Sequence, residues 1–184
     1  MIANKDRSMW FGASDVNYII AKNRNTATFK KWWLEKLGYV QNNFSNIYTA
    51  AGNNYEHKIL DALNIDGLVT DKQIRNAELR LRVNLDGNTD TTIYEVKTFK
   101  ESGRFRPNRY KKQIWVQMFG SGLRKAYIVA YPLCDNDYKN FFNPIDEKKI
   151  ILRPVEYNEE FITTVFLPNL TYLRDCLLKG IFPT

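Results

Sequence analysis

The stretch LRLRVNLD at residues 79–86 alternates strictly between apolar and polar side chains. Such alternation is typical of a β-strand with one buried face, because successive side chains of a strand point to opposite sides of the sheet. The apolar face is Leu79, Leu81, Val83 and Leu85, and the polar face is Arg80, Arg82, Asn84 and Asp86. Residues 87–90 are turn formers, and the β-branched and aromatic run TTIYEVKTF follows at 91–99. The pattern predicts a β-hairpin.

The segments around this hairpin predict helices and further strands. Helical patterns cover residues 15–22, 29–37, 47–63, 107–120 and 158–179, and apolar runs at 126–133 and 148–157 indicate two more strands. Ser14 is the expected N-cap of the first helix, and Pro168 is expected to interrupt the last one. Trp10, Trp32 and Trp33 are expected in the core. Strands interleaved with helices in this order predict an α/β (α+β) fold, a central mixed β-sheet flanked by helices.

A length of 184 residues predicts one domain, with a helical N-terminal part over about 1–65 and the sheet with its helices over about 66–184. No run of about 18 apolar residues occurs, so we expect no membrane-spanning helix, and residues 1–15 lack a secretory signal pattern. Cys134 and Cys176 lie too far apart for zinc spacing or a disulfide framework, which predicts a reducing, cytoplasmic location. With the single histidine His57, a metal would be held by carboxylate and carbonyl oxygens, which suit Mg²⁺ or Mn²⁺.

Positive charge is in excess, because 27 Lys and Arg against 20 Asp and Glu give a net charge of +7. This balance favours a polyanionic partner, first nucleic acid and second an anionic membrane surface. A basic run that contains aromatic residues comprises Lys97, Lys100, Arg104, Arg106, Arg109, Lys111 and Lys112, with Phe99, Phe105 and Tyr110 among them. A charge run is usually a solvated face, but this mixture also suits contact with phosphates and stacking on bases.

The second strand of the hairpin carries Glu95 and Lys97, which share a face because they are two residues apart. Asp86 stands on the facing strand, across the expected turn. Two nearby carboxylates repel each other, and a bound divalent cation is the usual resolution. With the Val96 carbonyl as a further oxygen, these residues predict a site for metal-assisted attack of water on a phosphodiester, in which Lys97 stabilises developing charge or orients the water.

The triplet (Asp/Glu)-x-Lys is by itself a weak signal, because it also occurs at residues 56–58, 137–139, 146–148 and 147–149. An ordinary surface charge pair, a turn aspartate at Asp86 or a structural ion pair at Glu95 are the alternatives. Context distinguishes the triplet at 95–97, since it lies inside an apolar strand and precedes a helix with Gln113 and Gln117.

At this point the sequence resembles the PD-(D/E)xK nuclease superfamily, specifically its phage lambda-exonuclease-like (YqaJ-like) branch. Eight residues separate Asp86, which precedes Gly87, from Glu95, and the two positions match the Asp and the (Asp/Glu)-x-Lys triplet of one hairpin. Residues 11–16 (FGASDV) resemble the Gly-x-Ser-Asp motif, residues 52–56 (GNNYE) the Gly-x3-Glu helix, and residues 110–113 (YKKQ) the Tyr-x2-Gln helix. Four motifs in the expected order span roughly residues 7–130. Two departures are Leu85 in place of the motif's proline, and Trp115 where a second glutamine is common.

The resemblance implies a restriction-endonuclease-like core around a catalytic hairpin, and a role for each matching residue. The implied metal ligands are Asp86, Glu95, the Val96 carbonyl and, directly or through water, Glu56. The implied catalytic group further includes Lys97 and Gln113. The implied DNA-binding residues are Arg7, Ser14, Arg104, Arg106, Arg109, Tyr110, Lys111 and Gln117, of which Arg7 and Ser14 would hold a terminal 5′ phosphate. For Ser14, helix capping and phosphate binding are compatible.

These roles imply a Mg²⁺-dependent DNA nuclease, with Mn²⁺ as a substitute metal, that digests duplex ends from 5′ to 3′ in phage-type recombination or DNA processing. A single-strand annealing protein, a homo-oligomer and a phage or prophage source are further implications of the resemblance. The alternatives are an endonuclease on branched or specific DNA, a catalytically silent DNA-binding module on the same fold, and a basic protein that binds RNA or acidic protein.

Overall fold

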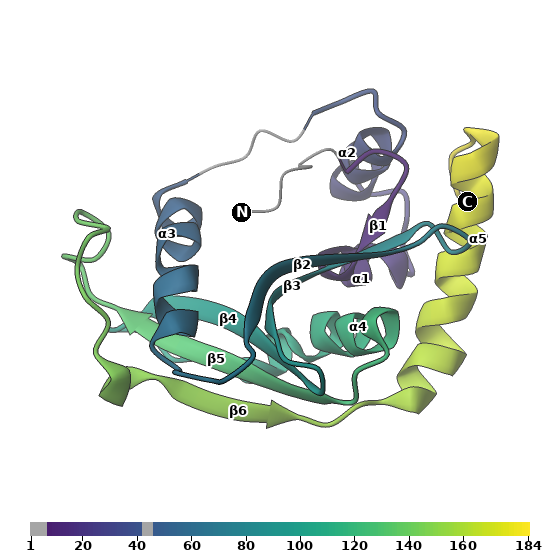
Figure 1. Cartoon of the computed structure of the whole chain (residues 1–184). Coiled ribbons are helices and arrows are strands. Elements are labelled where there is room, and N and C mark those ends of the chain that lie inside the picture. Colours follow the sequence, from purple (N-terminus) through teal and green to yellow (C-terminus); the bar gives the residue numbers. More distant parts are fainter. Residues whose placement is uncertain (1–6, 42–45) are drawn as a thin grey trace.

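The computed structural model describes residues 7–41 and 46–184, which form a six-stranded mixed sheet flanked by helices, as the sequence predicts (Figure 1). The strands are β1 (Phe11–Gly12), β2 (Val69–Asn76), β3 (Leu81–Asn88), β4 (Thr92–Lys100), β5 (Lys125–Leu133) and β6 (Ile151–Val155). The α-helices are α1 (Val16–Ile19), α2 (Ala27–Lys36), α3 (Ile47–Asp61), α4 (Lys111–Ser121) and α5 (Leu167–Lys179). Short 3-10 turns are η1 (Ala13–Asp15), η2 (Pro107–Arg109) and η3 (Glu147–Lys149), and a π-helical segment η4 (Phe161–Phe166) leads into α5.

The sheet is interrupted beside β3. On one edge of β3, β2 pairs antiparallel from Leu81 to Asn88. The opposite edge is shared by two strands, because β1 pairs in parallel with Leu81 and Arg82, whereas β4 pairs antiparallel only with Gly87 and Asn88. Between these two short pairings, the described residues 83–86 have no strand partner on that edge. β4 instead pairs along its whole length with β5.

Helices cover both faces of the sheet near this interruption. Tyr55 and Ile59 of α3 pack on Val96 and Val129, whereas α4 packs on the opposite face against the side chains of Leu85, Ile93 and Ile128. The alternation of strand side chains explains the division, since Ile93 and Val96 have opposite orientation on β4. The interruption in the sheet therefore lies between α3 and α4.

The N-terminal part contributes a buried polar group as well as helices. Asp15 Oδ2 accepts hydrogen bonds from Lys36 Nζ at 2.5 Å and from the Gly12 N–H at 2.7 Å, and Asp15 Oδ1 accepts one from Trp32 Nε1 at 3.0 Å. Burial lowers the pKa of Lys36, and the charge of Asp15 opposes this effect. A buried charge needs such a partner, so this cluster fixes α2 against β1 and η1.

Several local predictions were wrong. The expected turn at 87–90 begins later, because Gly87 and Asn88 still belong to β3, so Asp86 lies inside the strand. Ser14 does not cap the first helix; it lies exposed inside η1, and Asp15 makes the bond to the Gly12 N–H. Pro168 does not interrupt the last helix, because it lies in the first turn of α5, where a missing N–H is tolerated. Trp10 is only partly buried. None of the helices within the described ranges is long and apolar enough to cross a membrane.

Candidate active site

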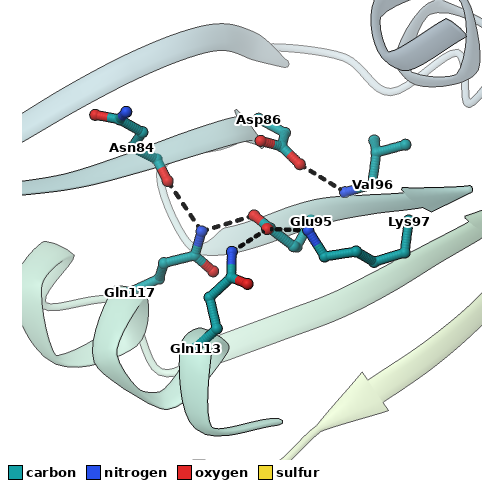
Figure 2. A network of polar contacts seen from close by, with 7 residues as sticks. All are labelled: Asn84, Asp86, Glu95, Val96, Lys97, Gln113 and Gln117. Carbon is teal, nitrogen blue, oxygen red and sulfur yellow. Dashed lines mark hydrogen bonds and ion pairs between the residues drawn. The ribbon is translucent and has the colours of Figure 1, made fainter. Parts of the chain in front are cut away.

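The interruption between β3 and β4 is closed by polar side chains instead of main-chain hydrogen bonds (Figure 2). Asp86 Oδ2 accepts a hydrogen bond from the Val96 N–H at 2.9 Å. Gln117 of α4 spans the same opening, because its Nε2 donates to the Asn84 carbonyl at 2.9 Å and to Glu95 Oε2 at 2.6 Å. Both of these partners are acceptors, which fixes the amide nitrogen of Gln117 between them.

Glu95 is the buried centre of this network, with a side chain only 2% exposed. Its Oε1 accepts from Lys97 Nζ at 2.6 Å and from Gln113 Nε2 at 2.5 Å, in addition to the bond from Gln117 to Oε2 (Figure 2). The two-residue spacing on β4 places Glu95 and Lys97 on one face, as expected. Gln113 and Gln117 reach the same carboxylate because residues four apart share a helix face.

Lys97 is held as a cation. Burial alone would lower its pKa, but the negative charges of Glu95 and Asp86 outweigh that effect and raise the pKa above the usual value. The Tyr110 ring lies beside the ammonium, with Lys97 Nζ 5.4 Å from the ring centroid. Behind Tyr110 stack Phe105, at a centroid distance of 6.1 Å, and then Phe99, at 5.3 Å from Phe105. An ammonium beside an aromatic ring is stabilised by the ring quadrupole.

Asp86 and Glu56 have raised pKa values. Burial is the larger cause for each carboxyl, and the negative charge of Glu95 adds to it. The hydrogen bond from the Val96 N–H lowers the pKa of Asp86 but does not compensate. Glu56 is half-buried on α3, and its carboxyl thus senses the charge on β4 from the other side of the opening. Three carboxylates converge here with Lys97 as the neighbouring cation.

The sequence prediction missed one acidic residue near this site. Asp71 lies on β2 between Thr70 and Lys72, which pair with Gly87 and Leu85 on either side of Asp86, and its carboxylate Oδ2 is 2.9 Å from His57 Nε2. Three potential metal-ligand atoms lie within 4.8 Å of one another here, one each from Glu56, His57 and Asp71. A strand pattern at 69–76 would have been the signal for Asp71, but β2 was not predicted.

The predicted DNA-binding residues divide into three groups. Arg104, Arg106 and Arg109 are exposed in the segment between β4 and α4, and Tyr110 and Lys111 are partly exposed where α4 begins. Arg7 and Ser14 are exposed on the other side of the interruption, before and within η1.

Gln117 is the third case, because the structure buries it inside the site. Its residue is 1% exposed, and its amide holds Glu95 and Asn84. Trp115, which departs from the expected motif, packs on Phe161 and donates to the Glu156 carbonyl at 2.8 Å. The helix face with Trp115 is therefore structural, and the face with Gln113 and Gln117 supports Glu95. At Gly52, the first residue of the Gly-x3-Glu motif, a Cβ would meet Thr98 Oγ1 at an ordinary 3.5 Å.

No protein-family model and no curated protein matches this sequence. Solved structures do match its fold. LHK-Exo in complex with dAMP has a TM-score of 0.69 at 19% identity, with 95% of this chain and 90% of that chain covered. The alkaline exonuclease LHK-Exo from Laribacter hongkongensis has a TM-score of 0.65 at 19% identity, with 95% and 94% covered. A phage-related exonuclease from Haemophilus somnus 129PT has a TM-score of 0.66 at 19% identity, with 93% and 96% covered. This chain has the fold of these exonucleases, which is consistent with its resemblance to the lambda-exonuclease-like branch.

Proposed function

We propose that this chain is a metal-dependent deoxyribonuclease that hydrolyses DNA phosphodiester bonds. The observation that carries the proposal is the opening between β3 and β4, where Asp86 and Glu95 approach from facing strands and Lys97 binds Glu95. Carboxylates beside a fixed ammonium are a donor set for a hard cation and for the developing charge of a phosphoryl group. The dAMP bound in one LHK-Exo structure supports a nucleotide as the kind of product.

The residues present fit a divalent cation such as Mg²⁺, with Mn²⁺ as a substitute. The carboxylates of Asp86, Glu95 and Glu56 and the carbonyl of Val96 would hold it. Burial and mutual repulsion raise the pKa values of Asp86 and Glu56, and a bound cation would relieve that repulsion. When bound, the cation supplies a Lewis acid for the phosphoryl oxygen and lowers the pKa of an attacking water.

The protein side chains supply charge and position. Lys97 stays protonated at neutral pH because its pKa is raised, so it stabilises negative charge that develops on the phosphate and does not act as a general base. Gln113 and Gln117 fix both oxygens of Glu95, which orients this carboxylate toward the opening. Such support of a ligand by its neighbours is what keeps a metal site in a productive geometry.

We further propose that the enzyme digests duplex ends from 5′ to 3′. Arg7 and Ser14 support this polarity, since both are exposed near β1, on the edge of β3 that also borders the site. A 5′ phosphate there would present the next bond to the carboxylates. Removal of the 5′ phosphate from a duplex should then slow its digestion by the native chain. The same removal should slow digestion by Ser14→Ala to a smaller extent. A single-strand annealing protein and further copies of this chain are the partners that the resemblance implies.

The decisive experiment is degradation of linear duplex DNA with Mg²⁺ or with EDTA, by the native chain, Lys97→Ala and the control Lys125→Ala. Lys125 is an exposed lysine at the start of β5, so it matches the change in charge away from the site. Degradation that needs Mg²⁺, is lost in Lys97→Ala and persists in Lys125→Ala supports the proposal. Absence of degradation by folded native protein, with salt-sensitive DNA binding retained, would favour the silent binding module.

Covalently closed circular duplex separates the two nuclease alternatives. An exonuclease leaves this substrate intact, whereas an endonuclease cuts it. Cutting of the circle would therefore overturn the exonuclease part of the proposal and keep the hydrolytic part.

A further inference from the structure

The β2–β3 ribbon carries a row of polar residues that leads away from the candidate active site. On the face that includes Asp86, the next positions along β3 are Asn84 and Arg82. Their cross-strand neighbours on β2 are Gln73 and Arg75, and Gln73 Nε2 donates to Asn84 Oδ1 at 3.0 Å. The ribbon thus changes from an acidic end at the site, through an amide pair, to a pair of arginines.

Two arginines converge on one aromatic ring at the basic end of this row. The Cζ atoms of Arg75 and Arg80 lie 5.4 and 5.7 Å from the ring centroid of Trp10. Arg75 is exposed, and its Nε donates to Gln73 Oε1 at 2.8 Å, which fixes the direction of its guanidinium. Within residues 7–41 and 46–184, no carboxylate forms an ion pair with Arg75 or Arg80.

Like charges gathered without an acidic partner favour an anion at that place. A purely structural role is the alternative, in which each guanidinium simply covers the Trp10 ring. One arginine would serve that role, whereas a second one on the same ring adds repulsion between like charges. A phosphate backbone removes this repulsion.

The spacing along the ribbon fits a nucleic-acid strand. Arg75 pairs with Arg82, which lies four positions before Asp86 on β3, an interval of about 14 Å at about 3.4 Å per residue. The phosphates of one DNA strand advance by about 3.4 Å each along the duplex axis, so this interval corresponds to about four nucleotides.

We propose that Arg75, Arg80 and Trp10 form a phosphate-binding surface that contacts duplex DNA about four nucleotides from the bond that is cut. The inference rests on the proposed action on DNA and deepens it, because it names a contact remote from the reacting atoms. The guanidiniums bind phosphates as charges, and Trp10 holds both in place.

The test measures binding of a 20-base-pair duplex in EDTA as a function of salt, so that no cleavage occurs. Arg75→Gln with Arg80→Gln should lower the slope of log K against log salt by about 1.8, since each lost phosphate contact contributes about 0.9. The lysine pair, Arg75→Lys with Arg80→Lys, should retain most of the slope, because it keeps the charge. The control pair is Lys125→Gln with Arg153→Gln, at exposed positions of β5 and β6 far from β2 in the strand order.

A slope that is unchanged in the glutamine pair, or that falls equally in the control pair, would overturn the inference. Thermal unfolding of each variant shows that the compared proteins are folded. Failure of the nuclease proposal is a separate result, because binding in EDTA does not depend on hydrolysis. If the native chain cuts no DNA but the salt slope still falls in the glutamine pair, the phosphate-binding surface is supported and the nuclease proposal is not.

Discussion

The carboxylate of Asp86 accepts a hydrogen bond from the main-chain N–H of Val96 at 2.9 Å. In a continuous hairpin, a main-chain carbonyl of β3 would accept this bond, but β3 and β4 pair only at Gly87 and Asn88. The side chain therefore replaces a missing backbone contact and brings Asp86 beside the peptide whose carbonyl belongs to Glu95. The hydrogen-bonding groups are satisfied, while the negative charges of Asp86 and Glu95 remain close.

Asp86→Asn should stabilise the metal-free protein and inactivate it. The raised pKa of Asp86 means that the folded state disfavours its charge, so this carboxylate reduces stability as pH rises above its usual pKa near 4. Asparagine keeps an acceptor for the Val96 N–H without the charge. We expect a Tm increase of about 2–4 °C in EDTA at neutral pH, equivalent to about 1 kcal/mol in a chain of this length.

The same variant should show no Mg²⁺-induced rise in Tm. Its nuclease rate should fall by at least about 100-fold, because loss of a residue that only supports a metal ligand already lowers activity by up to about 100-fold. Scanning calorimetry with EDTA and with Mg²⁺ checks both stability statements. A lower Tm in EDTA would show that the hydrogen bond of the carboxylate outweighs the repulsion.

Lys97 should contribute stability up to strongly alkaline pH. Its folded pKa is raised above the unfolded value, so the contribution is fully present below about pH 10.4 and is lost as pH rises through the folded pKa. For the same reason, the nuclease rate should show no descending limb from Lys97 between about pH 8 and 10. Rates of the native chain and Lys97→Arg across this range provide the check, and a limb near pH 8 that only the native chain shows would contradict the assignment.

Gln117→Met should destabilise the protein more than Gln113→Met. Loss of the Gln117 amide leaves Glu95 Oε2 and the Asn84 carbonyl without a partner in a buried place, at a cost of about 1–3 kcal/mol. Gln113 is partly exposed, and Lys97 still binds the oxygen that Gln113 contacts, so about 0.5–1.5 kcal/mol is expected there. Urea unfolding of the two variants measures the difference, and equal costs would mean that water replaces the Gln117 amide.

The sequence predicts the centre of the site better than its surroundings. Glu95 and Lys97 could be placed together because the period of a strand is independent of the rest of the fold. The helix period likewise places Gln113 and Gln117 on one face, but it does not tell whether that face meets solvent or β4. This is why Gln117 was expected on DNA although it lies buried on Glu95.

The missed strand β2 has a physical reason. Its sequence VTDKQIRN contains few apolar residues, because it lies at the edge of the sheet and much of it is solvent-exposed. Edge strands of this kind carry charges and lack the alternation that identifies β3. The sequence argument could not place Asp71 and Arg75 for the same reason, since only the pairing of β2 with β3 relates them to Asp86.

Gly120→Ala should move α4 and weaken the site. A Cβ at Gly120 would lie 2.7 Å from Val83 Cγ1, in a core where the β-branched valine cannot turn aside easily. Overpacking costs about 1–3 kcal/mol, which exceeds the roughly 1 kcal/mol that alanine gains over glycine in a helix. Because α4 carries Gln113 and Gln117, the nuclease rate should fall as well.

Val83→Ala provides the control, because it removes the two methyl groups that a Cβ at Gly120 would strike. The double variant Gly120→Ala with Val83→Ala should lose less free energy of unfolding than the two single variants lose together. The expected difference is about 0.5–3 kcal/mol, the range for residues in contact. Urea unfolding of the two single variants and the double variant measures this coupling. Strictly additive effects would mean that α4 relaxes elsewhere, and that close contact at Gly120 does not set the position of the glutamines on Glu95.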